Sequence, residues 1–504
     1  MDLCSLITHN AAFTPDKPAI HFEGETLSYA GLSARIAQTA RALKSELGVK
    51  RGDRIAILSQ NRPDYLVLLY ACARLGAMLV PMNWRLAVAE QMFILADASP
   101  KVLVLEQAFA PVLPALAERM PETGIVGLDF GPERGVTFDT LLSRDDGEPT
   151  DDADLSCPLL IVYTSGTTGR PKGAVLRQEA LLWNGVMSQH MHSLTSDDHV
   201  LTVLPLFHVG GLNIQTTPAL HHGATVTLHA RFAPDATLTA IARNRPTLTV
   251  LVPATIQAVT EHPAWADTDL SSLKAIATGS TIVPQALIDR ITARSVPVLQ
   301  VYGSTETCPI AVYTRLGGDL SRAGSTGLAG LCCEATIIGG DGNAVAPGVA
   351  GEIVVRGPNV LTEYWGNVDA TRKALQDGWY RTGDIGRRDT RGYFWVLERK
   401  NNLIISGGEN IYPAEVERVL IAHPDVVECG VIGRPDPRWD EVPVAFVIKR
   451  QGASLDADSL KLHLQTQLAR FKLPREIIFV DDLPRTALGK VQHHLLRQLD
   501  SSER

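Results

Sequence analysis

The strongest constraint on this chain is a short polar segment that directly follows an apolar one. Residues 159–163 are apolar and predict a buried strand, and residues 164–173 then contain three glycines, four hydroxyl side chains and one lysine. Glycine lets backbone N–H groups approach a ligand closely, while hydroxyls and a lysine donate to phosphate oxygens. The pattern predicts a polyphosphate-binding loop after a strand. Its candidate binding residues are Thr164, Ser165, Gly166, Thr167, Thr168, Gly169 and Lys172.

This loop differs from the phosphate loop of P-loop NTPases, which requires G-x-x-x-x-G-K-[ST]. Counted from Gly166, Pro171 stands where the second glycine belongs, and Gly173 replaces the final Ser or Thr. A solvated turn is the simple alternative, because clusters of Gly, Ser and Thr usually form turns. The density of glycines and donors favours a ligand site.

Composition and charge limit the class of protein. A chain of 504 residues is long enough for two or more domains, and 45% hydrophobic with 20% charged residues is typical of a globular protein. The net charge of 47 − 55 = −8 gives no indication of a nucleic-acid surface. The seven cysteines are scattered without metal-ligand spacing, and the N-terminus lacks the features of a secretory signal. We therefore expect a cytoplasmic protein. Its most apolar stretch, residues 65–82, contains Arg74 and predicts a buried helix and strand, not a membrane span.

Helical and strand-like segments alternate along most of the chain, which predicts parallel sheets covered by helices. Strands predicted at 247–252, 273–277 and 298–301 each end in small, hydroxylated residues before a helix. Ligands of open α/β sheets bind at the carboxyl ends of strands, so these loops predict one crevice. The pattern changes to short strands and turns from residue 351, and to a compact set of helices and strands from residue 413. We expect an α/β fold with a large domain of helix-covered sheets, a β-rich subdomain and a small α+β domain.

Three further residues are candidates for chemistry. Glu306 follows a predicted strand near the phosphate loop, where a carboxylate could hold Mg²⁺ together with phosphate oxygens. An exposed glutamate at a helix start is the alternative. His208, next to Phe207, is either a packed core histidine or a pocket residue, and Lys490 is either a solvated charge or a catalytic one.

These segments resemble the adenylate-forming (ANL) enzymes, which include acyl-CoA synthetases, firefly luciferase and the adenylation domains of peptide synthetases. The motif wording is similar to that of bacterial fatty-acyl-CoA and aryl- or feruloyl-CoA synthetases. The resemblance implies an N-terminal adenylation domain, 1–400, that binds ATP and the acid. It also implies a small mobile C-terminal domain, 401–504, that carries the catalytic lysine. The matching motifs lie, in order, at 163–176, 302–306, 381–384, 399–413 and 485–490.

The resemblance also implies roles for single residues. Lys490 would be the mobile catalytic lysine, Thr305 would contact the α-phosphate and Glu306 would bind Mg²⁺. His208 would lie between the acid pocket and the thiol tunnel. The remaining residues expected to bind ATP or CoA are Tyr302, Gly303, Ser304, Asp384, Arg399, Gly407 and Gly408, with Tyr302 on the adenine, Asp384 on the ribose and Gly408 near the pantetheine. The expected acid pocket comprises Phe207, Gly211, Leu212, Thr278, Gly279, Ser280 and Cys308.

The hinge between the two expected domains departs from the family pattern. The usual motif is Arg-x-[Lys/Asp]-[Asp/Glu], whereas this chain has Asn401 and Asn402 at the last two positions. Because two charges are replaced by neutral amides, the balance between the two domain orientations stays open.

The implied reaction has two steps, with ATP, Mg²⁺ and CoA as cofactors. A carboxylate attacks ATP to give an acyl-adenylate and pyrophosphate, and CoA then displaces AMP. The expected pocket lacks a cation, which favours a hydrophobic monocarboxylate, either fatty or aromatic. Two alternatives stay open, an enzyme that loads a carrier protein and an adenylation-deficient nucleotide-binding relative. The sequence indicates no nucleic-acid or membrane partner, and leaves a homodimer open.

Overall fold

The computed structural model separates into two compact units, which we describe one at a time. The first consists of Met1–Ser280, Ala286–Ala335 and Val355–Tyr380, and the second of Thr281–Gln285, Thr336–Val354 and Arg381–Arg504. The expected domain division at residue 400 stays a prediction. The structure describes residues 1–143, 153–164, 171–280, 283–406, 409–437, 439–465, 467–468, 470–486 and 489–502.

An eight-stranded sheet in the first unit holds the phosphate-loop strand. β8 (Pro158–Thr164) and β9 (Lys172–Arg177) form an antiparallel hairpin in which Thr164 lies opposite Lys172. The buried strand predicted before the loop is confirmed. The strand order is β19-β9-β8-β4-β3-β5-β6-β7. The other strands are β3 (Arg54–Leu58), β4 (Met78–Pro81), β5 (Val102–Leu105), β6 (Gly124–Gly127), β7 (Val136–Thr137) and β19 (Glu363–Tyr364).

A nine-stranded sheet in the same unit contains the three strands predicted to share a crevice. They are β12 (Leu248–Val250), β13 (Ala275–Thr278) and β14 (Val298–Tyr302), and β10 (His199–Thr202) lies beside β12. All four are parallel, so their carboxyl ends meet at one edge. The order is β16-β15-β14-β13-β12-β10-β11-β1-β2. The outer strands are β1 (Pro18–Phe22), β2 (Glu25–Ser28), β11 (Thr225–Leu228), β15 (Val312–Tyr313) and β16 (Leu328–Ala329).

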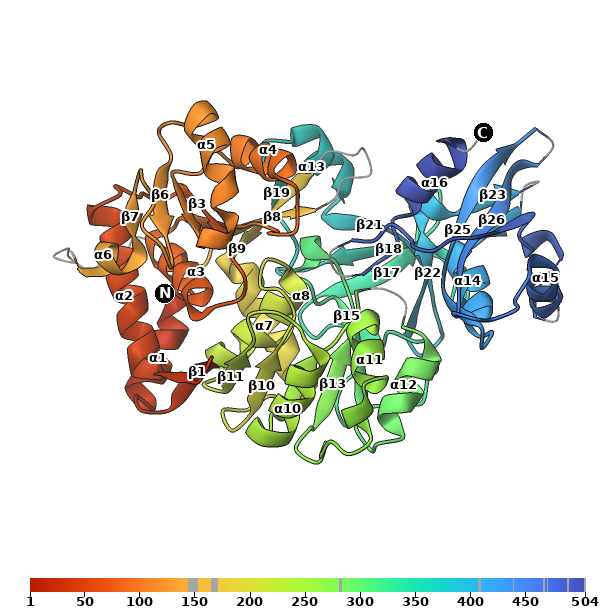
Figure 1. Cartoon of the computed structure of the whole chain (residues 1–504), viewed down its shortest axis with the longest axis horizontal. Helices are drawn as coiled ribbons and strands as arrows, with labels where there is room; N and C mark the ends of the chain where they lie inside the picture. The colour runs from red at the N-terminus through yellow and green to blue at the C-terminus, as the bar shows by residue number, and fades with distance from the viewer. Residues whose placement is uncertain are drawn as a thin grey trace. The chain divides into compact units, whose positions relative to one another are not determined.

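Helices pack on both sheets of the first unit, where α1, α2 and α3 gather in the red part of the chain and α10, α11 and α12 in the green part (Figure 1). No helix in the described part of the chain combines the length and the apolar character needed to cross a bilayer. The helices of this unit are α1 (Cys4–Phe13), α2 (Tyr29–Ser45), α3 (Pro63–Leu75), α4 (Val88–Ala98), α5 (Leu113–Arg119), α6 (Phe138–Ser143), α7 (Gln178–His192), α10 (Pro234–Asn244), α11 (Pro253–Thr260), α12 (Gln285–Thr292) and α13 (Val368–Ala374).

Helix α3 begins one residue later than its sequence suggests. Asn61 looks like an N-cap, but Arg62 occupies that position. The Asn61 side chain instead donates to the Leu204 and His229 carbonyls at 2.9 and 3.0 Å. It therefore connects the start of α3 to the segments that follow β10 and β11. The helix ends at Gly76, whose φ of 64° is left-handed and suits glycine.

The chain after β10 forms a turn at His208 that opens a series of short helices. α8 (Val209–Gly211) leads into η2 (Leu212–Thr216), a π-helical turn, and then into α9 (Thr217–His221). π-Helical turns are rare and often occur at functional sites.

Two smaller sheets lie mainly in the second unit. β18 (Gly351–Arg356) lies between β17 (Glu334–Ile338) and β21 (Trp379–Arg388), and β22 (Phe394–Arg399) pairs with β21, as expected of a β-rich subdomain. The other sheet is composed of β23 (Ile404–Ser406), β24 (Glu409–Ile411), β25 (Val426–Asp436), β26 (Asp440–Lys449) and β27 (Glu476–Phe479).

Three helices accompany the second of these sheets. They are α14 (Pro413–Ile421), α15 (Ala457–Gln465) and α16 (His493–Ser502), and α14 and α16 pack on β25 (Figure 1). Val416, Val431 and Leu460 are fully buried in the core between them.

Candidate functional site

The expected phosphate loop connects the two strands of the β8–β9 hairpin. Its central residues, Ser165–Gly169, lie outside the described residues, so only its two ends can be placed. Thr164 and Lys172 are paired, with Thr164 Oγ1 at 3.5 Å from the Lys172 carbonyl oxygen. Lys172 Nζ lies 5.6 Å from the ring centroid of Tyr364, within cation–π range. The structure thus places a positive charge at one end of the hairpin.

Glu306 lies in η4 (Thr305–Thr307), the turn that follows β14, and its side chain is buried together with that of Thr305. Its Oε1 accepts a 2.8 Å hydrogen bond from the hydroxyl of Tyr364. Among the described residues, no lysine or arginine forms an ion pair with this carboxylate. Burying a charge without an opposite charge is costly, so this carboxylate is a candidate ligand for a cation.

The turn that carries Glu306 is tight enough to require glycine before it. A Cβ added at Gly303 would lie 1.6 Å from the Pro309 carbonyl oxygen. Gly303 therefore brings the end of β14, including the half-buried Tyr302, close to the segment after η4. This contact fixes the backbone around Glu306.

Two residues expected to bind substrate carry buried hydroxyls without a partner. Thr278, at the end of β13, is fully buried, and Ser304 precedes η4. Neither Oγ has a hydrogen-bond partner in the described part of the chain. A buried unsatisfied hydroxyl costs about 1–3 kcal/mol, so both groups are expected to meet a ligand or water.

His208 caps α8, and its Nδ1 accepts a 3.0 Å hydrogen bond from the Gly210 amide. Burial lowers the pKa of His208 to about 4, so the ring is neutral at pH 7. Because Nδ1 accepts, the ring proton lies on Nε2. The buried Phe207 packs edge-on against Trp84, with ring centroids 6.5 Å apart.

Two glycines expected in the acid pocket serve backbone packing. A Cβ at Gly211 would lie 2.3 Å from the Pro205 oxygen, and one at Gly279 would lie 2.3 Å from the Val301 oxygen. A bulky residue at Gly279 would collide with β14, so such a change would report on folding and not on the acids that the pocket accepts.

The other expected pocket residues differ in burial. Leu212 and Cys308 are buried, and the Cys308 sulfur accepts a 3.5 Å hydrogen bond from Asn213 Nδ2. Ser280 is exposed and has a left-handed φ of 76°. Leu212 and Cys308 therefore lie in the packed interior of the first unit, whereas Ser280 faces solvent.

The second unit brings its expected site residues into one charged cluster. Arg399 Nε lies 2.8 Å from Asp384 Oδ1, across the β21–β22 pair. Lys490 is half-buried, and burial and the nearby Arg399 charge lower its pKa, while Asp384 and Glu398 oppose this shift. Gly407 and Gly408 lie outside the described residues.

Tyr364 was not among the residues expected from the sequence. It lies 58 residues after Glu306, in the two-residue strand β19. Its only local signal is the adjacent Trp365, because aromatic residues are common in strands. The contact with Glu306 depends on how β19 joins the sheet, which the sequence does not reveal.

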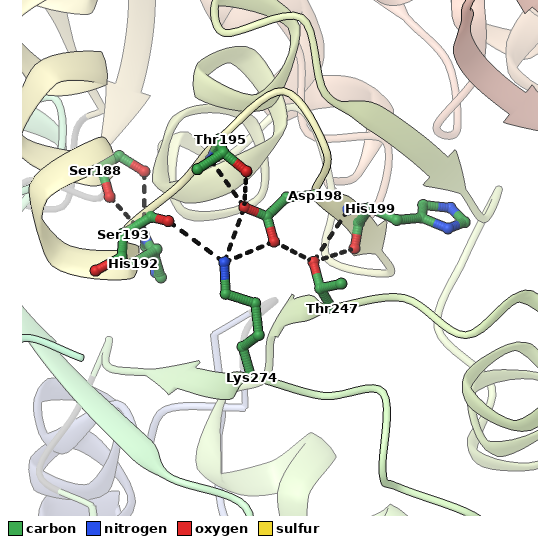
Figure 2. A network of polar contacts seen from close by, with 8 residues as sticks. All are labelled: Ser188, His192, Ser193, Thr195, Asp198, His199, Thr247 and Lys274. Carbon is green, nitrogen blue, oxygen red and sulfur yellow. Dashed lines mark hydrogen bonds and ion pairs between the residues drawn. The ribbon is translucent and has the colours of Figure 1, made fainter. Parts of the chain in front are cut away.

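A second polar cluster lies at the amino ends of the parallel strands. Asp198, Thr247 and Lys274 precede β10, β12 and β13 respectively. Lys274 Nζ lies 2.9 and 3.0 Å from the two Asp198 carboxylate oxygens, and Thr247 Oγ1 donates a 2.7 Å hydrogen bond to the same carboxylate (Figure 2). The Thr195 amide donates a 2.8 Å hydrogen bond to Asp198 Oδ2. This cluster is internally paired and joins three strands.

Comparison with known proteins decides the family. The model of the AMP-binding enzyme family matches residues 7–365, and that of the AMP-binding enzyme C-terminal domain matches residues 415–490. The chain belongs to the AMP-binding enzyme family. The expected adenylate-forming family and its α/β fold are therefore confirmed.

Similar proteins span the whole chain. The indoleacetate–CoA ligase of Aromatoleum aromaticum is 50% identical over 501 residues, which cover 99% of this chain and 98% of that protein. The solved anthranilate CoA ligase in complex with anthranoyl-AMP is 28% identical with a TM-score of 0.93, covering 100% of this chain and 98% of that one. The O-succinylbenzoate coenzyme A synthetase of Bacillus subtilis, in complex with ATP and magnesium ion, is 32% identical with a TM-score of 0.87, covering 99% of both chains.

Proposed function

We propose that this protein activates an aromatic carboxylic acid, of the arylacetate or indolylacetate type, as its acyl-adenylate and transfers the acyl group to CoA. The broader class is established, because relatives that are similar over the full length are acid–CoA ligases, and the chain is an ATP-dependent ligase of this type. The aromatic acid is the finer step. It rests on the 50% identity with an indoleacetate–CoA ligase, supported by an anthranilate ligase of the same fold.

The residues of the first unit fit a magnesium nucleotide. The described residues include no group of three or more His, Cys, Asp or Glu that could hold a metal. Mg²⁺ is usually bound in such sites by one or two carboxylates together with phosphate oxygens and water. Glu306 offers one buried carboxylate, and Lys172 and Thr164 lie at the ends of the phosphate loop. Bound Mg²⁺ would neutralise phosphate charge.

The roles of the chain's own groups follow from this arrangement. Thr305 and Ser304 lie in the same turn as Glu306 and would donate hydroxyl hydrogen bonds to phosphate oxygens. Such preorganised donors typically contribute about 3–4 kcal/mol to transition-state stabilisation. Lys490 would act in adenylation, and its lowered pKa reflects the desolvation expected of a working lysine.

The acid pocket is proposed to hold an aromatic ring without a second carboxylate. Phe207 and Leu212 are apolar and buried, and the pocket residues expected from the sequence include no lysine or arginine. An acid with a second carboxylate would leave that charge unpaired, at a cost of several kcal/mol. We therefore expect poor activity with dicarboxylic acids such as malonate.

A product assay tests the proposal. Purified protein is supplied with ATP, Mg²⁺ and indole-3-acetate, phenylacetate, ferulate, decanoate or malonate, each with and without CoA. We expect CoA-dependent AMP release, with acyl-CoA identified by mass, for an arylacetate. A preference for decanoate would overturn the proposal that the substrate is an aromatic acid. Pyrophosphate release without consumption of CoA would support loading of a carrier protein.

The half-reactions separate the role of Lys490 from a general loss of function. Lys490→Ala is expected to slow pyrophosphate formation about 10²–10³-fold, while thioester formation from supplied acyl-adenylate survives. Lys461→Ala, on α15, is the matched control. An equal loss in both half-reactions would contradict this role.

A further inference from the structure

We propose that Tyr364 is a positioning residue of the nucleotide site, which holds both the Glu306 carboxylate and the Lys172 ammonium group in place for a magnesium–triphosphate ligand. The proposal rests on the function proposed above, and it assigns a role to a residue outside the expected motifs. It begins with two contacts of one side chain.

The first contact is made by the Tyr364 hydroxyl. It donates to Glu306 Oε1 at 2.8 Å, and both side chains are buried. A hydrogen bond to one carboxylate oxygen restricts rotation of the group, and no described residue forms a hydrogen bond with Oε2, which can therefore face a cation. Such partners of a metal-binding carboxylate orient it, and removing them typically costs 10–100-fold in metal affinity.

The second contact is made by the ring of the same tyrosine. Lys172 Nζ lies 5.6 Å from the ring centroid, so the ring holds the ammonium group by a cation–π contact. One side chain therefore touches an acidic and a basic group that bear opposite charges. A ligand that carries both a divalent cation and phosphate oxygens needs both groups at once.

The backbone around Tyr364 is fixed to both partners independently. β19 pairs with β9, the strand that begins at Lys172, with Tyr364 opposite Ala174. The Trp365 amide donates to the Gly173 carbonyl at 2.7 Å. Backbone pairing therefore holds the Tyr364 segment on β9, the strand that follows the expected phosphate loop.

The same short segment also holds the turn of Glu306. The Leu361 amide donates to the Glu306 carbonyl at 2.7 Å. Asn359 Nδ2 donates to the carbonyls of Thr307 and Ile310 at 2.9 and 2.8 Å. Residues 359–365 therefore connect β9 to η4, and Tyr364 is the member that reaches both charged side chains.

The test uses two substitutions at this position and one matched control. Tyr364→Phe removes only the hydroxyl, and Tyr364→Leu removes the ring as well. Tyr29→Phe is the control, because Tyr29 is also a buried tyrosine and its hydroxyl donates to the Ala224 carbonyl at 2.7 Å. Glu306→Gln is measured in parallel to test the metal role itself.

The main measurement is binding, not turnover. Mn²⁺ is titrated by electron paramagnetic resonance into each protein with a non-cleavable ATP analogue, and binding of the analogue without metal is measured by calorimetry. Tyr364→Phe is expected to weaken Mn²⁺ binding about 10-fold and to leave metal-free nucleotide binding unchanged. Tyr364→Leu should weaken both, because Lys172 also loses its support.

Each result decides a separate point. If Glu306→Gln weakens Mn²⁺ binding but Tyr364→Phe binds like the wild type, the positioning role is wrong while the proposed function stands. If Glu306→Gln leaves Mn²⁺ binding unchanged, the metal role of Glu306 fails, and the Tyr364 proposal fails with it. If Tyr364→Phe and Tyr29→Phe shift the melting temperature and the Mn²⁺ affinity alike, Tyr364 is merely structural.

Discussion

The two ends of the parallel strands in the nine-stranded sheet carry polar groups that are used in opposite ways. At the amino ends, Asp198 is surrounded by Lys274, Thr247 and Thr195, and its carboxylate oxygens are bonded within the protein (Figure 2). At the carboxyl ends, Thr278 has a buried hydroxyl without a described partner. At the amino ends, the polar side chains already form hydrogen bonds within the fold. At the carboxyl ends, the Thr278 hydroxyl has no partner among the described residues and can bond a ligand.

This contrast separates structural from functional polarity on the same strands. Strand direction alone does not distinguish the two ends, because both are polar in sequence. The satisfaction of each polar atom does distinguish them. Substitutions at the amino ends should therefore change stability and leave activity intact, and substitutions at the carboxyl ends should do the reverse.

The largest effect is expected at the carboxyl end, from Glu306→Gln. Loss of the buried charge should slow adenylation about 10²–10³-fold, equivalent to about 3–4 kcal/mol, and raise the Mg²⁺ concentration needed for half-maximal rate. Pyrophosphate exchange across a Mg²⁺ titration measures this. The control is Glu334→Gln, which changes an exposed carboxylate paired with Arg356. An unchanged Mg²⁺ titration would show that Glu306 does not bind the metal, and the proposed difference between the two ends would then lose its support at the carboxyl end.

Lys274→Met is the corresponding change at the amino end. It leaves the buried Asp198 carboxylate without its cation, and we expect a loss of about 3 kcal/mol in the free energy of unfolding, at the lower end for such pairs because Lys274 is partly exposed. Urea unfolding measures the loss, and kcat per folded molecule should stay unchanged. Arg245→Met, at the exposed pair with Asp269, should cost less than about 1 kcal/mol.

The pH dependence of this ion pair has a definite sign. Burial would raise the pKa of Asp198, but hydrogen bonds from Thr247 and Lys274 outweigh burial and lower it. A carboxyl group with a lowered pKa in the folded state stabilises the fold above its unfolded pKa, and this contribution is lost as the pH falls through the folded value. The effect of Lys274→Met should therefore shrink below about pH 4.

Both ends of the parallel strands have a buried histidine nearby, so this feature does not distinguish the two ends. Burial lowers the pKa of His192, close to the amino-end cluster, to about 4, as it does for His208 at the other end. Between pH 4 and pH 6.5 the unfolded chain binds more protons, so stability falls as the pH decreases through this range.

His192→Gln should remove about 2 kcal/mol of the stability difference between pH 7.5 and pH 5. Urea unfolding at the two pH values measures it, with the exposed His9→Gln as the control. An unaltered difference would mean that His192 is not buried as neutral imidazole.

The smallest and most direct test is a matched pair of Thr→Val substitutions. Thr247→Val removes a hydroxyl that bonds Asp198, and should cost about 1–2 kcal/mol of stability without affecting catalysis. Thr278→Val removes a hydroxyl without a described partner. It should leave the free energy of unfolding unchanged or higher, and weaken substrate binding by about 1 kcal/mol, roughly fivefold in KM. Equal destabilisation by both changes would remove the distinction between the two ends.

Local sequence patterns were sufficient for the parallel strands and for the turns after them. The apolar segments before Thr278 and Tyr302 are short, and each ends in small polar residues, so both strand and loop are visible in the sequence. Glu306 could be singled out because a carboxylate close to a predicted phosphate site can hold Mg²⁺ together with phosphate oxygens.

Contacts between distant segments could not be predicted in this way. Tyr364 gives no sign in the sequence that it reaches Glu306, because that contact requires β19 to join β9. Asn61 shows the same limit, since its position before Pro63 suits an N-cap but its amide donates to the carbonyls of Leu204 and His229. The backbone role of Gly279 also depends on a neighbouring strand, which only the folded sheet supplies.

The joining of β19 to β9 also affects the order in which the protein can mature. Thr362 and Val175, which bond across this edge, are 187 residues apart. At a synthesis rate of about 5–20 residues per second, a ribosome needs roughly 10–40 s to pass from one to the other. Throughout that interval the residues of β8 and β9 have been synthesised and Tyr364 has not. The proposed nucleotide site is therefore complete only late in synthesis, and a chain interrupted before residue 364 lacks the tyrosine that we propose as its positioning residue.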